Sequence, residues 1–246
     1  VEICTVSGYS EFGKNMTAVR YENEVVIVDM GIQPEKFIRY TENEDDYASL
    51  NTASLVKAEA IPDTSPIKDW AELVKAIVPG HAHLDHSGAI VYLANDYKAP
   101  ILCTPFTAEV VKGMFKDREV ICKNKISVIQ PNGIKKVSKN MKVEFINATH
   151  STPQSSMIAV HTPEGIVLYA CDFKLDPTPT LGKPTNTKRL KELKNVLAVI
   201  VESTYGSKPG RTPSEAVAKD MLGDAVDEAD TRKNAIIVTT FSSHIA

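Results

Sequence analysis

PGHAHLDHSGAI, residues 79–90, gathers three histidines and one aspartate into six positions and then turns apolar. The chain of 246 residues has only six histidines, so packing alone is a poor explanation for three of them in one short stretch. Neutral imidazole nitrogens and carboxylate oxygens together form the ligand set of borderline divalent ions such as zinc and manganese. The stretch therefore predicts a metal site rather than an ordinary polar loop.

Spacing within this stretch divides the ligands into two pairs. His81 and His83 are two residues apart, so in an extended loop their side chains can bind one ion from the same side. Asp85 and His86 are adjacent at the expected start of a helix, where they cannot easily share the geometry of the first pair. We expect the second pair to bind a second ion.

Short apolar segments rich in β-branched residues alternate with longer helical segments along the chain, which predicts the α/β class. The expected strands are residues 25–28, 76–78, 143–146, 166–170 and 196–201. The expected helices are residues 85–95, 105–115 and 213–228, the last with Thr212 as its N-cap and Glu215 completing a capping box. The proline- and threonine-rich segment 172–195 is expected to be a surface excursion.

Metal-binding residue types follow five of these strands directly or within a few positions. Besides the histidine cluster, they are Asp29, His150, Asp172 and Glu202. Loops at the carboxyl ends of strands are where ligands gather in layered α/β proteins. The coincidence predicts one convergent site.

Composition sets the broader class. The hydrophobic content of 43% can form a sizeable core, and a net charge of −3 argues against a generalised basic surface for nucleic acid. No stretch approaches the roughly 18 apolar residues that a membrane-spanning helix needs. The four cysteines are far apart and include no CxxC pair, which favours a reducing, cytoplasmic setting over a disulfide framework.

HAHLDH resembles the HxHxDH motif of the metallo-β-lactamase superfamily, and Asp29, His150 and Asp172 stand where its other motifs are expected. Four further stretches, SEFGKNMT, THSTPQS, CDFKLDPTP and ESTYG, resemble the β-CASP branch and, within it, the ribonuclease J family. The resemblance implies a four-layer αββα fold, followed by the start of a β-CASP α/β domain.

The resemblance also implies a dinuclear site, with zinc as the expected metal and manganese as the alternative. One ion would be held by His81, His83 and His150, and the other by Asp85, His86 and Asp172, with Asp172 bridging. Asp29 would orient the ligands without binding an ion. Glu202 matches an acidic motif of the branch, although a carboxylate that merely caps a strand end is the alternative. The implied catalytic residues are Asp29, Asp85, Asp172 and Glu202.

The implied activity is metal-dependent hydrolysis of RNA phosphodiester bonds in RNA processing and decay. Cleavage would be exonucleolytic from 5′ to 3′ with a preference for 5′-monophosphate ends, and endonucleolytic cleavage is the alternative mode. The expected partner is single-stranded RNA, with no membrane association and a homodimer for the full-length protein. Residues 1–207 would form the lactamase-like domain, and residues 208–246 the first helix and strand of a truncated β-CASP domain that lacks later histidine motifs.

Three other functions remain open. A small-molecule hydrolase of thioesters or lactams shares the metal site, but SEFGKNMT and ESTYG weigh against it. A non-catalytic RNA-processing subunit would be expected to lose ligands that this chain retains. A flavin-linked di-iron reductase would be expected to have a glutamate in place of His83. His161, in the strand-like run MIAVHT, is expected to pack or meet solvent rather than bind metal.

Overall fold

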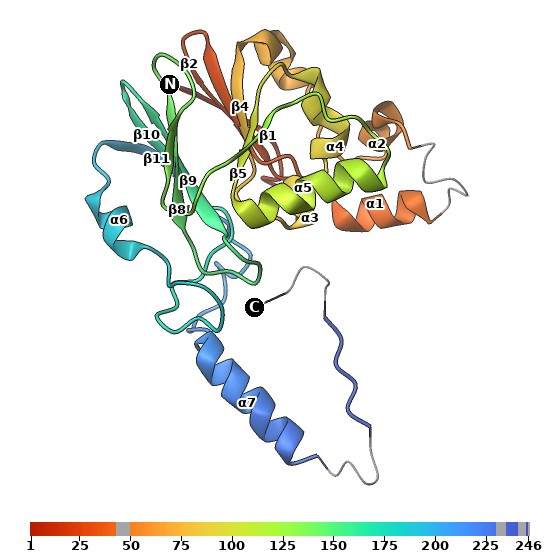
Figure 1. The fold of residues 1–246 in the computed structure, drawn as a ribbon, viewed down its shortest axis with the longest axis vertical. Coiled ribbons are helices and arrows are strands. Elements are labelled where there is room, and N and C mark those ends of the chain that lie inside the picture. The colour runs from red at the N-terminus through yellow and green to blue at the C-terminus, as the bar shows by residue number, and fades with distance from the viewer. Residues whose placement is uncertain (43–49, 230–234, 241–244, 246) are drawn as a thin grey trace.

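The computed structural model describes residues 1–42, 50–229, 235–240 and 245. Two β-sheets pack face to face, and helices cover their outer faces (Figure 1). This is the four-layer α/β arrangement predicted from the sequence. All five expected strands are present, each within two residues of its predicted bounds.

The first sheet has six strands in sequential order. They are β1 (Glu2–Ser7), β2 (Met16–Tyr21), β3 (Glu24–Val28), β4 (Val74–Val78), β5 (Ile101–Cys103) and β6 (Ile126–Val128). β1, β2 and β3 pair antiparallel, whereas β3 to β6 run parallel. The carboxyl ends of β3 and β4 therefore lie side by side.

The second sheet has five strands in the order β11-β10-β9-β8-β7. They are β7 (Ile134–Lys136), β8 (Lys142–Asn147), β9 (Ser156–Thr162), β10 (Gly165–Tyr169) and β11 (Val196–Ile200). Only β10 and β11 pair in parallel; the other pairs are antiparallel. β8 and β10 both run antiparallel to β9, so their carboxyl ends emerge at the same edge.

Side chains that alternate along the strands build a core on each face of the sheets. The core between the sheets contains Val26, Val28 and Val78 from the first and Phe145, Val160 and Val167 from the second. On the outer face of the first sheet, Val25 and Ile27 pack with residues of the covering helices. A third, smaller core lies on the outer face of the second sheet. Strands buried on both faces explain why these runs are almost wholly apolar.

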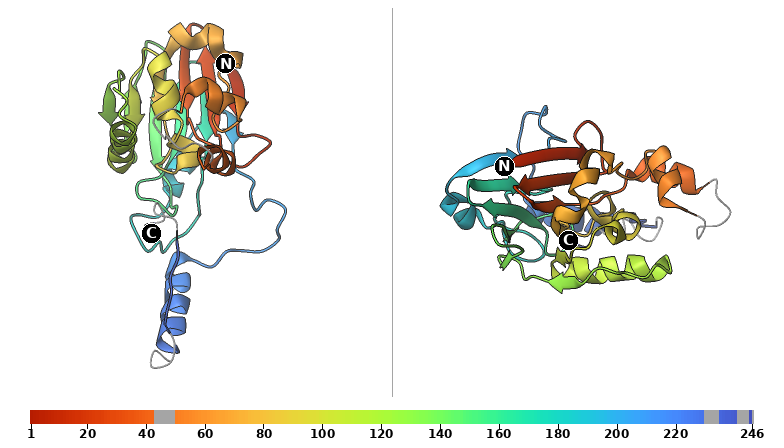
Figure 2. Two further views of the ribbon diagram at one scale, coloured as in Figure 1. Left: turned by 90° about the vertical axis from the view of Figure 1, so that its right-hand side faces the viewer. Right: turned by 90° about the horizontal axis from the view of Figure 1, so that it is seen from above.

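Helices form the two outer layers, as the views in Figure 2 show. The first sheet is covered by α1 (Pro34–Thr41), α2 (Thr52–Lys57), the 3-10 helix η2 (Ser65–Leu73), α4 (Ile90–Leu93) and α5 (Pro105–Asp117). The second sheet is covered by α6 (Thr187–Glu192), through Leu190 and the adjacent Leu193. The segment 172–195 is therefore part of a layer, not only a surface excursion. No helix in the described ranges is long and apolar enough to cross a membrane.

The single helix expected over residues 85–95 is broken into α3 (Leu84–Ser87), α4 and the 3-10 helix η3 (Ala94–Asp96). The carbonyl oxygen of Asp85 accepts from the backbone amide of Asn15 at 3.1 Å, while the amide of Ala89 donates to Met30 at 2.8 Å. The hydrogen bond that would join Asp85 to Ala89 in a continuous helix is thus replaced by two tertiary bonds. The short helix α3 is therefore held by the loop before β2 through Asn15 and by the loop after β3 through Met30.

The last described helix, α7 (Glu215–Asp227), begins two residues later than expected. Its N-cap is Ser214, whose hydroxyl accepts from the amide of Val217, and not Thr212. The Glu215 carboxylate accepts from Thr180 instead of closing a capping box. Figure 1 shows α7 projecting away from the two sheets. Residues 235–240, the described part of the segment that follows, form no strand, so the expected first β-CASP strand is not found there.

Candidate metal centre

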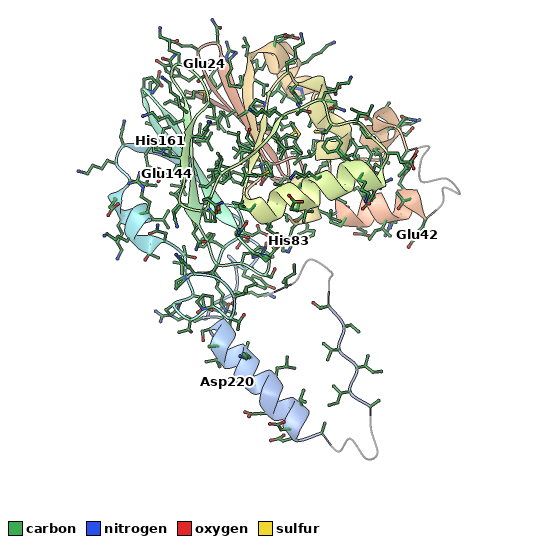
Figure 3. The ribbon with its side chains drawn as sticks, in the orientation of Figure 1. Glu24, Glu42, His83, Glu144, His161 and Asp220 are labelled. Carbon is green, nitrogen blue, oxygen red and sulfur yellow. The ribbon has the colours of Figure 1, made fainter. Side chains whose placement is uncertain are left out.

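The predicted ligands lie at one edge of the sandwich, where the loops after β4, β8 and β10 meet. Figure 3 places His83 at this edge, while His161 and Glu144 lie on the second sheet away from it. His81 and His83 follow β4, Asp85 and His86 lie in α3, His150 follows β8, and Asp172 follows β10. Parallel alignment of β3 and β4 and a shared edge for β8 and β10 bring these distant segments together.

Three histidines and one aspartate form the first group of facing ligand atoms. His83 Nδ1 lies 3.0 Å from His81 Nε2 and 3.0 Å from His150 Nε2. An oxygen of Asp172, Oδ2, lies 3.6 Å from His150 Nε2. All four ligand atoms lie within 4.8 Å of one another. We call His81, His83, His150 and Asp172 the three-histidine group.

Two carboxylates and one histidine form the second group. His86 Nε2 lies 3.4 Å from Asp85 Oδ2 and 3.4 Å from Asp172 Oδ1. We call Asp85, His86 and Asp172 the carboxylate group. Asp172 belongs to both groups and turns a different oxygen toward each.

These distances suit divalent ions. Ligands at about 2.0–2.1 Å from a tetrahedral ion lie about 3.3 Å from one another. The five separations given above, 3.0–3.6 Å, bracket that value. His83 Nδ1 has either one proton or one lone pair, so it cannot make a full hydrogen bond to both neighbouring imidazole nitrogens. A cation between the three nitrogens would accept a lone pair from each. The donor set therefore fits two ions.

Burial prepares two of the histidines as neutral ligands. His81 is fully buried, and desolvation, with the charge of neighbouring histidines, holds its pKa well below the usual value. Burial likewise lowers the pKa of His150 to about 4. Because a metal binds the unprotonated imidazole, neither residue needs to lose a proton to bind an ion at neutral pH.

Asp29 lies on the buried side of the site and contacts His86 and Gly80. Its side chain is completely buried; Oδ1 accepts from the backbone amide of Gly80 at 2.8 Å, and Oδ2 lies 2.7 Å from His86 Nδ1. Burial lowers the pKa of His86, but the nearby carboxylates of Asp29 and Asp172 outweigh burial, and the pKa stands well above its usual value. Asp29 thus lies beside the ligands and outside both groups.

Cys171 is a neighbour of the site that sequence reasoning missed. Its Sγ lies 3.1 Å from His81 Nδ1 and 3.6 Å from His86 Nδ1, and burial raises the pKa of the thiol to about 12. The three residues form a further group of close ligand atoms. The available signal is its position directly before Asp172, because Cys171 has no CxxC partner that would mark it as a ligand.

Asn15 was missed as well, although it lies in the quoted stretch SEFGKNMT. Its side-chain amide donates to the carbonyl of Asp85 at 3.0 Å and lies 3.2 Å from His86 Nε2. With its backbone amide also bonded to the Asp85 carbonyl, Asn15 fixes the start of α3. The loop that precedes β2 is thereby joined to the carboxylate group.

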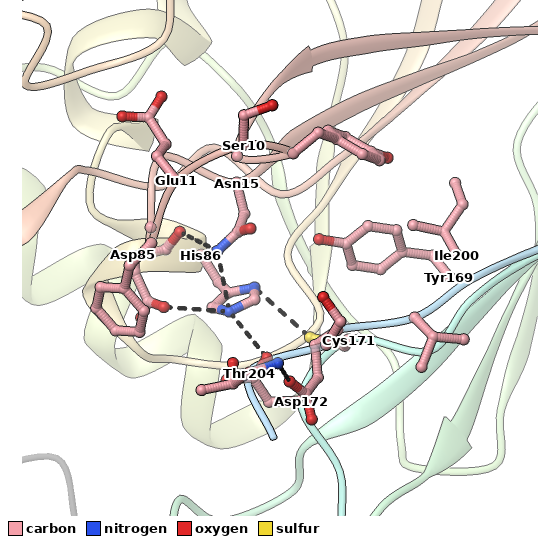
Figure 4. A pocket seen from close by; sticks show the side chains of 17 residues that line it. Ser10, Glu11, Asn15, Asp85, His86, Tyr169, Cys171, Asp172, Ile200 and Thr204 are labelled. Carbon is pink, nitrogen blue, oxygen red and sulfur yellow. Dashed lines mark hydrogen bonds and ion pairs between the residues drawn. The ribbon is translucent and has the colours of Figure 1, made fainter. Parts of the chain in front are cut away.

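A cavity of about 400 Å³ opens beside the carboxylate group. Figure 4 shows Asn15, Asp85, His86, Cys171 and Asp172 among its labelled residues. Glu202 also lines this cavity but is exposed, belongs to neither ligand group, and accepts from the amide of Thr204 at 2.7 Å. The structure thus brings Glu202 to the exposed rim of the cavity, outside both ligand groups.

His161 lies on the second sheet, outside both ligand groups, and pairs with Glu144. Its Nε2 lies 2.8 Å from Glu144 Oε2, and Arg189 of α6 makes two further hydrogen bonds to the same carboxylate, at 2.6 and 3.0 Å. This cluster ties α6 to the outer face of the second sheet. It makes His161 a suitable control for experiments on the metal centre.

The profile of the metallo-beta-lactamase superfamily matches residues 72–221, and the chain belongs to this superfamily. Among curated proteins, the whole chain is 43% identical to ribonuclease J of Pyrococcus abyssi (strain GE5 / Orsay), over 54% of that protein. It is 39% identical to ribonuclease J of Methanocaldococcus jannaschii, over 55% of that protein. The predicted resemblance to ribonuclease J is confirmed, and the chain spans about half the length of these relatives.

A crystal structure of a protein of unknown function from Enterococcus faecalis V583 has a similar fold. The TM-score is 0.64 at 17% identity, with 92% of this chain and 57% of the other covered. At this identity the match shows a similar fold and nothing about function. Together with the superfamily match, it confirms the predicted four-layer fold.

Proposed function

We propose that this chain forms the metal-binding part of a ribonuclease that hydrolyses RNA phosphodiester bonds with two divalent ions. The observation that carries the proposal is the position of Asp172, which turns one oxygen toward each ligand group. Two ions held a few ångströms apart supply a hydroxide nucleophile at neutral pH and stabilise charge on a phosphodiester. Zinc is favoured by the three converging imidazoles, and manganese by the carboxylates.

The chain's own residues have separate tasks in this proposal. The three-histidine group would hold one ion and the carboxylate group the other, and Asp172 would contribute one oxygen to each. Asp29 keeps the Nδ1 proton of His86 on the buried side, so that Nε2 faces the cavity. Asp85 and Asp172 face the same cavity, where the scissile phosphate would lie. Glu202, at the rim, is positioned to act on the substrate or its water and not on the ions.

The finer features of the proposal rest on the similarity to ribonuclease J. They are 5′-to-3′ exonucleolytic cleavage, preference for a 5′-monophosphate, single-stranded RNA as substrate, a homodimeric full-length protein and a cytoplasmic location. The division into a lactamase-like domain over residues 1–207 and the start of a β-CASP domain from residue 208 belongs to the same proposal. Projection of α7 from the sandwich supports that boundary.

The direct test uses the full-length protein and RNA with a 5′-monophosphate and a label at its 5′ end. We expect labelled mononucleotide to be released with zinc or manganese and nothing to be released with a chelator. Asp172→Ala should abolish release, whereas His161→Ala, the matched control outside the site, should not. Long labelled fragments would indicate endonucleolytic cleavage. Hydrolysis of a thioester or lactam with RNA left intact would overturn the substrate assignment.

A further inference from the structure

We propose that Cys171 is a positioning residue for the three-histidine group: its thiol holds the His81 ring so that Nε2 faces the ion. The inference rests on the proposed two-metal site and adds a residue that the site's sequence motifs did not indicate. It concerns how the chain prepares a ligand, and it does not make the cysteine itself a ligand.

The two nitrogens of His81 face different partners. Nδ1 lies 3.1 Å from Cys171 Sγ, and Nε2 lies 3.0 Å from His83 Nδ1, among the converging ligand atoms. In a neutral imidazole one nitrogen carries the proton and the other a lone pair. When Nδ1–H donates to the sulfur, the lone pair of Nε2 points to the place of the ion. An outer hydrogen bond of this kind fixes both the proton position and the orientation of a metal-binding histidine.

The backbone holds the thiol in this place. Cys171 adopts a left-handed conformation, with φ of +56°, directly before Asp172. The facing residue is Gly80, and a Cβ there would come within 2.7 Å of the sulfur. The side chain of Cys171 is buried in the core between the sheets. A left-handed residue and a close glycine contact together aim the sulfur at His81.

The alternative occupant of this place is a third ion, bound by Cys171, His81 and His86. Geometry argues against it, because His86 Nδ1 already lies 2.7 Å from Asp29 Oδ2 and is 3.6 Å from the sulfur. His86 is therefore anchored by a carboxylate, while His81 is anchored by the thiol. It follows that loss of the thiol should weaken the three-histidine group and spare the carboxylate group.

The test uses Cys171→Gly, because glycine adopts the left-handed conformation without strain, so the thiol and its Cβ are removed while the backbone conformation can be kept. Cys171→Ser retains a hydrogen-bond acceptor. Cys103→Ala is the matched control, since this second buried cysteine lies in β5 and packs on the helical side of the first sheet. Thermal unfolding of each metal-free variant checks that it folds.

Two measurements are made on the protein. Competition with a chromophoric chelator gives the affinities of the two zinc ions, and ¹⁵N NMR of labelled histidines in the metal-free protein reports which nitrogen of His81 is protonated. For Cys171→Gly we expect one zinc affinity to fall about 10-fold or more. We also expect His81 to change from one protonated form to a mixture. In both measurements, the result for Cys171→Ser should lie between those for wild type and Cys171→Gly. Cys103→Ala should have the zinc affinities and the His81 proton position of wild type.

Unchanged zinc affinities together with an unchanged His81 proton position in folded Cys171→Gly would overturn the proposal. An equal fall of both affinities would also overturn it, because the carboxylate group should be spared. The ribonuclease proposal fails separately, if the full-length wild-type protein binds two zinc ions but leaves RNA intact. If the wild type binds no zinc, the two-metal premise fails, and the NMR result in metal-free protein still decides the hydrogen bond.

Discussion

The Asp172 carboxylate is where the two ligand groups meet, since Oδ1 faces His86 and Oδ2 faces His150. The other ligands each serve one group. This division makes the consequences of single substitutions distinguishable. Loss of Asp172 should affect both ions, loss of Asp29 should affect the orientation of the His86 ring, and a change of pH should affect the two groups differently.

Asp172→Ala should reduce bound metal to well under one ion per chain, because each group loses an anionic ligand. Metal analysis after gel filtration checks this result. A fall by only one equivalent would contradict the bridging position. His161→Ala, which breaks only the contact with Glu144, should retain the wild-type metal content.

Asp29→Asn should reduce turnover about 10- to 100-fold while most of the metal stays bound. The amide cannot supply the negative charge that faces His86 Nδ1, so the ring loses its fixed orientation without losing its ligand atom. Parallel kinetics and metal analysis separate the two effects. Complete loss of metal with this variant would instead place Asp29 among the ligands.

The two groups should also respond differently to pH. The pKa of His86 is raised in the metal-free protein, so below that pKa an ion must displace a proton to bind the carboxylate group. Affinity at this group should rise with pH and level off above the raised pKa of His86. The lowered pKa values of His81 and His150 mean that these two ligands of the three-histidine group release no proton to an ion near neutrality. Calorimetry in buffers of different ionisation enthalpy measures the protons released; identical release at both steps would contradict this account.

At the scale of elements, the site depends on three short segments held together by backbone hydrogen bonds. The loop before β2 contacts α3 through Asn15, and the loop after β3 contacts it through Met30, whose amide donates to His86 at 2.9 Å. Gly31 lies so close to α3 that a Cβ would come within 1.6 Å of the Asp85 carbonyl oxygen. The broken helix and the loops therefore act as one unit.

Gly31→Ala should lower the free energy of unfolding by about 3 kcal/mol or more, because the new methyl group meets backbone that cannot move away without displacing the ligands. The affinity of the carboxylate group for metal should also fall in Gly31→Ala, because the displaced backbone belongs to Asp85 and His86. Gly113→Ala in α5 is the matched control, since a Cβ there has no atom within 4 Å. It should raise stability by up to about 1 kcal/mol. Denaturant unfolding measures both changes, and equal behaviour of the two variants would contradict the close approach.

For the whole molecule, the sequence predicted what depends on local pattern. Runs such as VVIV and VLAVIV identified β3 and β11, and the polar residues after the strands identified one common edge. Contacts between distant segments could not be predicted in this way. The helix after His83 is broken by bonds to Asn15 and Met30, and Cys171 reaches His81 across 90 residues. The structure also shows that Ser214, and not Thr212, caps α7.

The proposed centre holds two ions joined by one aspartate, Asp172. X-ray absorption spectroscopy of the zinc-loaded protein, with metal analysis of the same sample, tests it most directly. We predict two zinc ions per chain and a metal–metal distance of about 3.5–4 Å. That distance should be lost in Asp172→Ala and retained in His161→Ala. One zinc ion per chain, or two without a metal–metal signal, would contradict the claim.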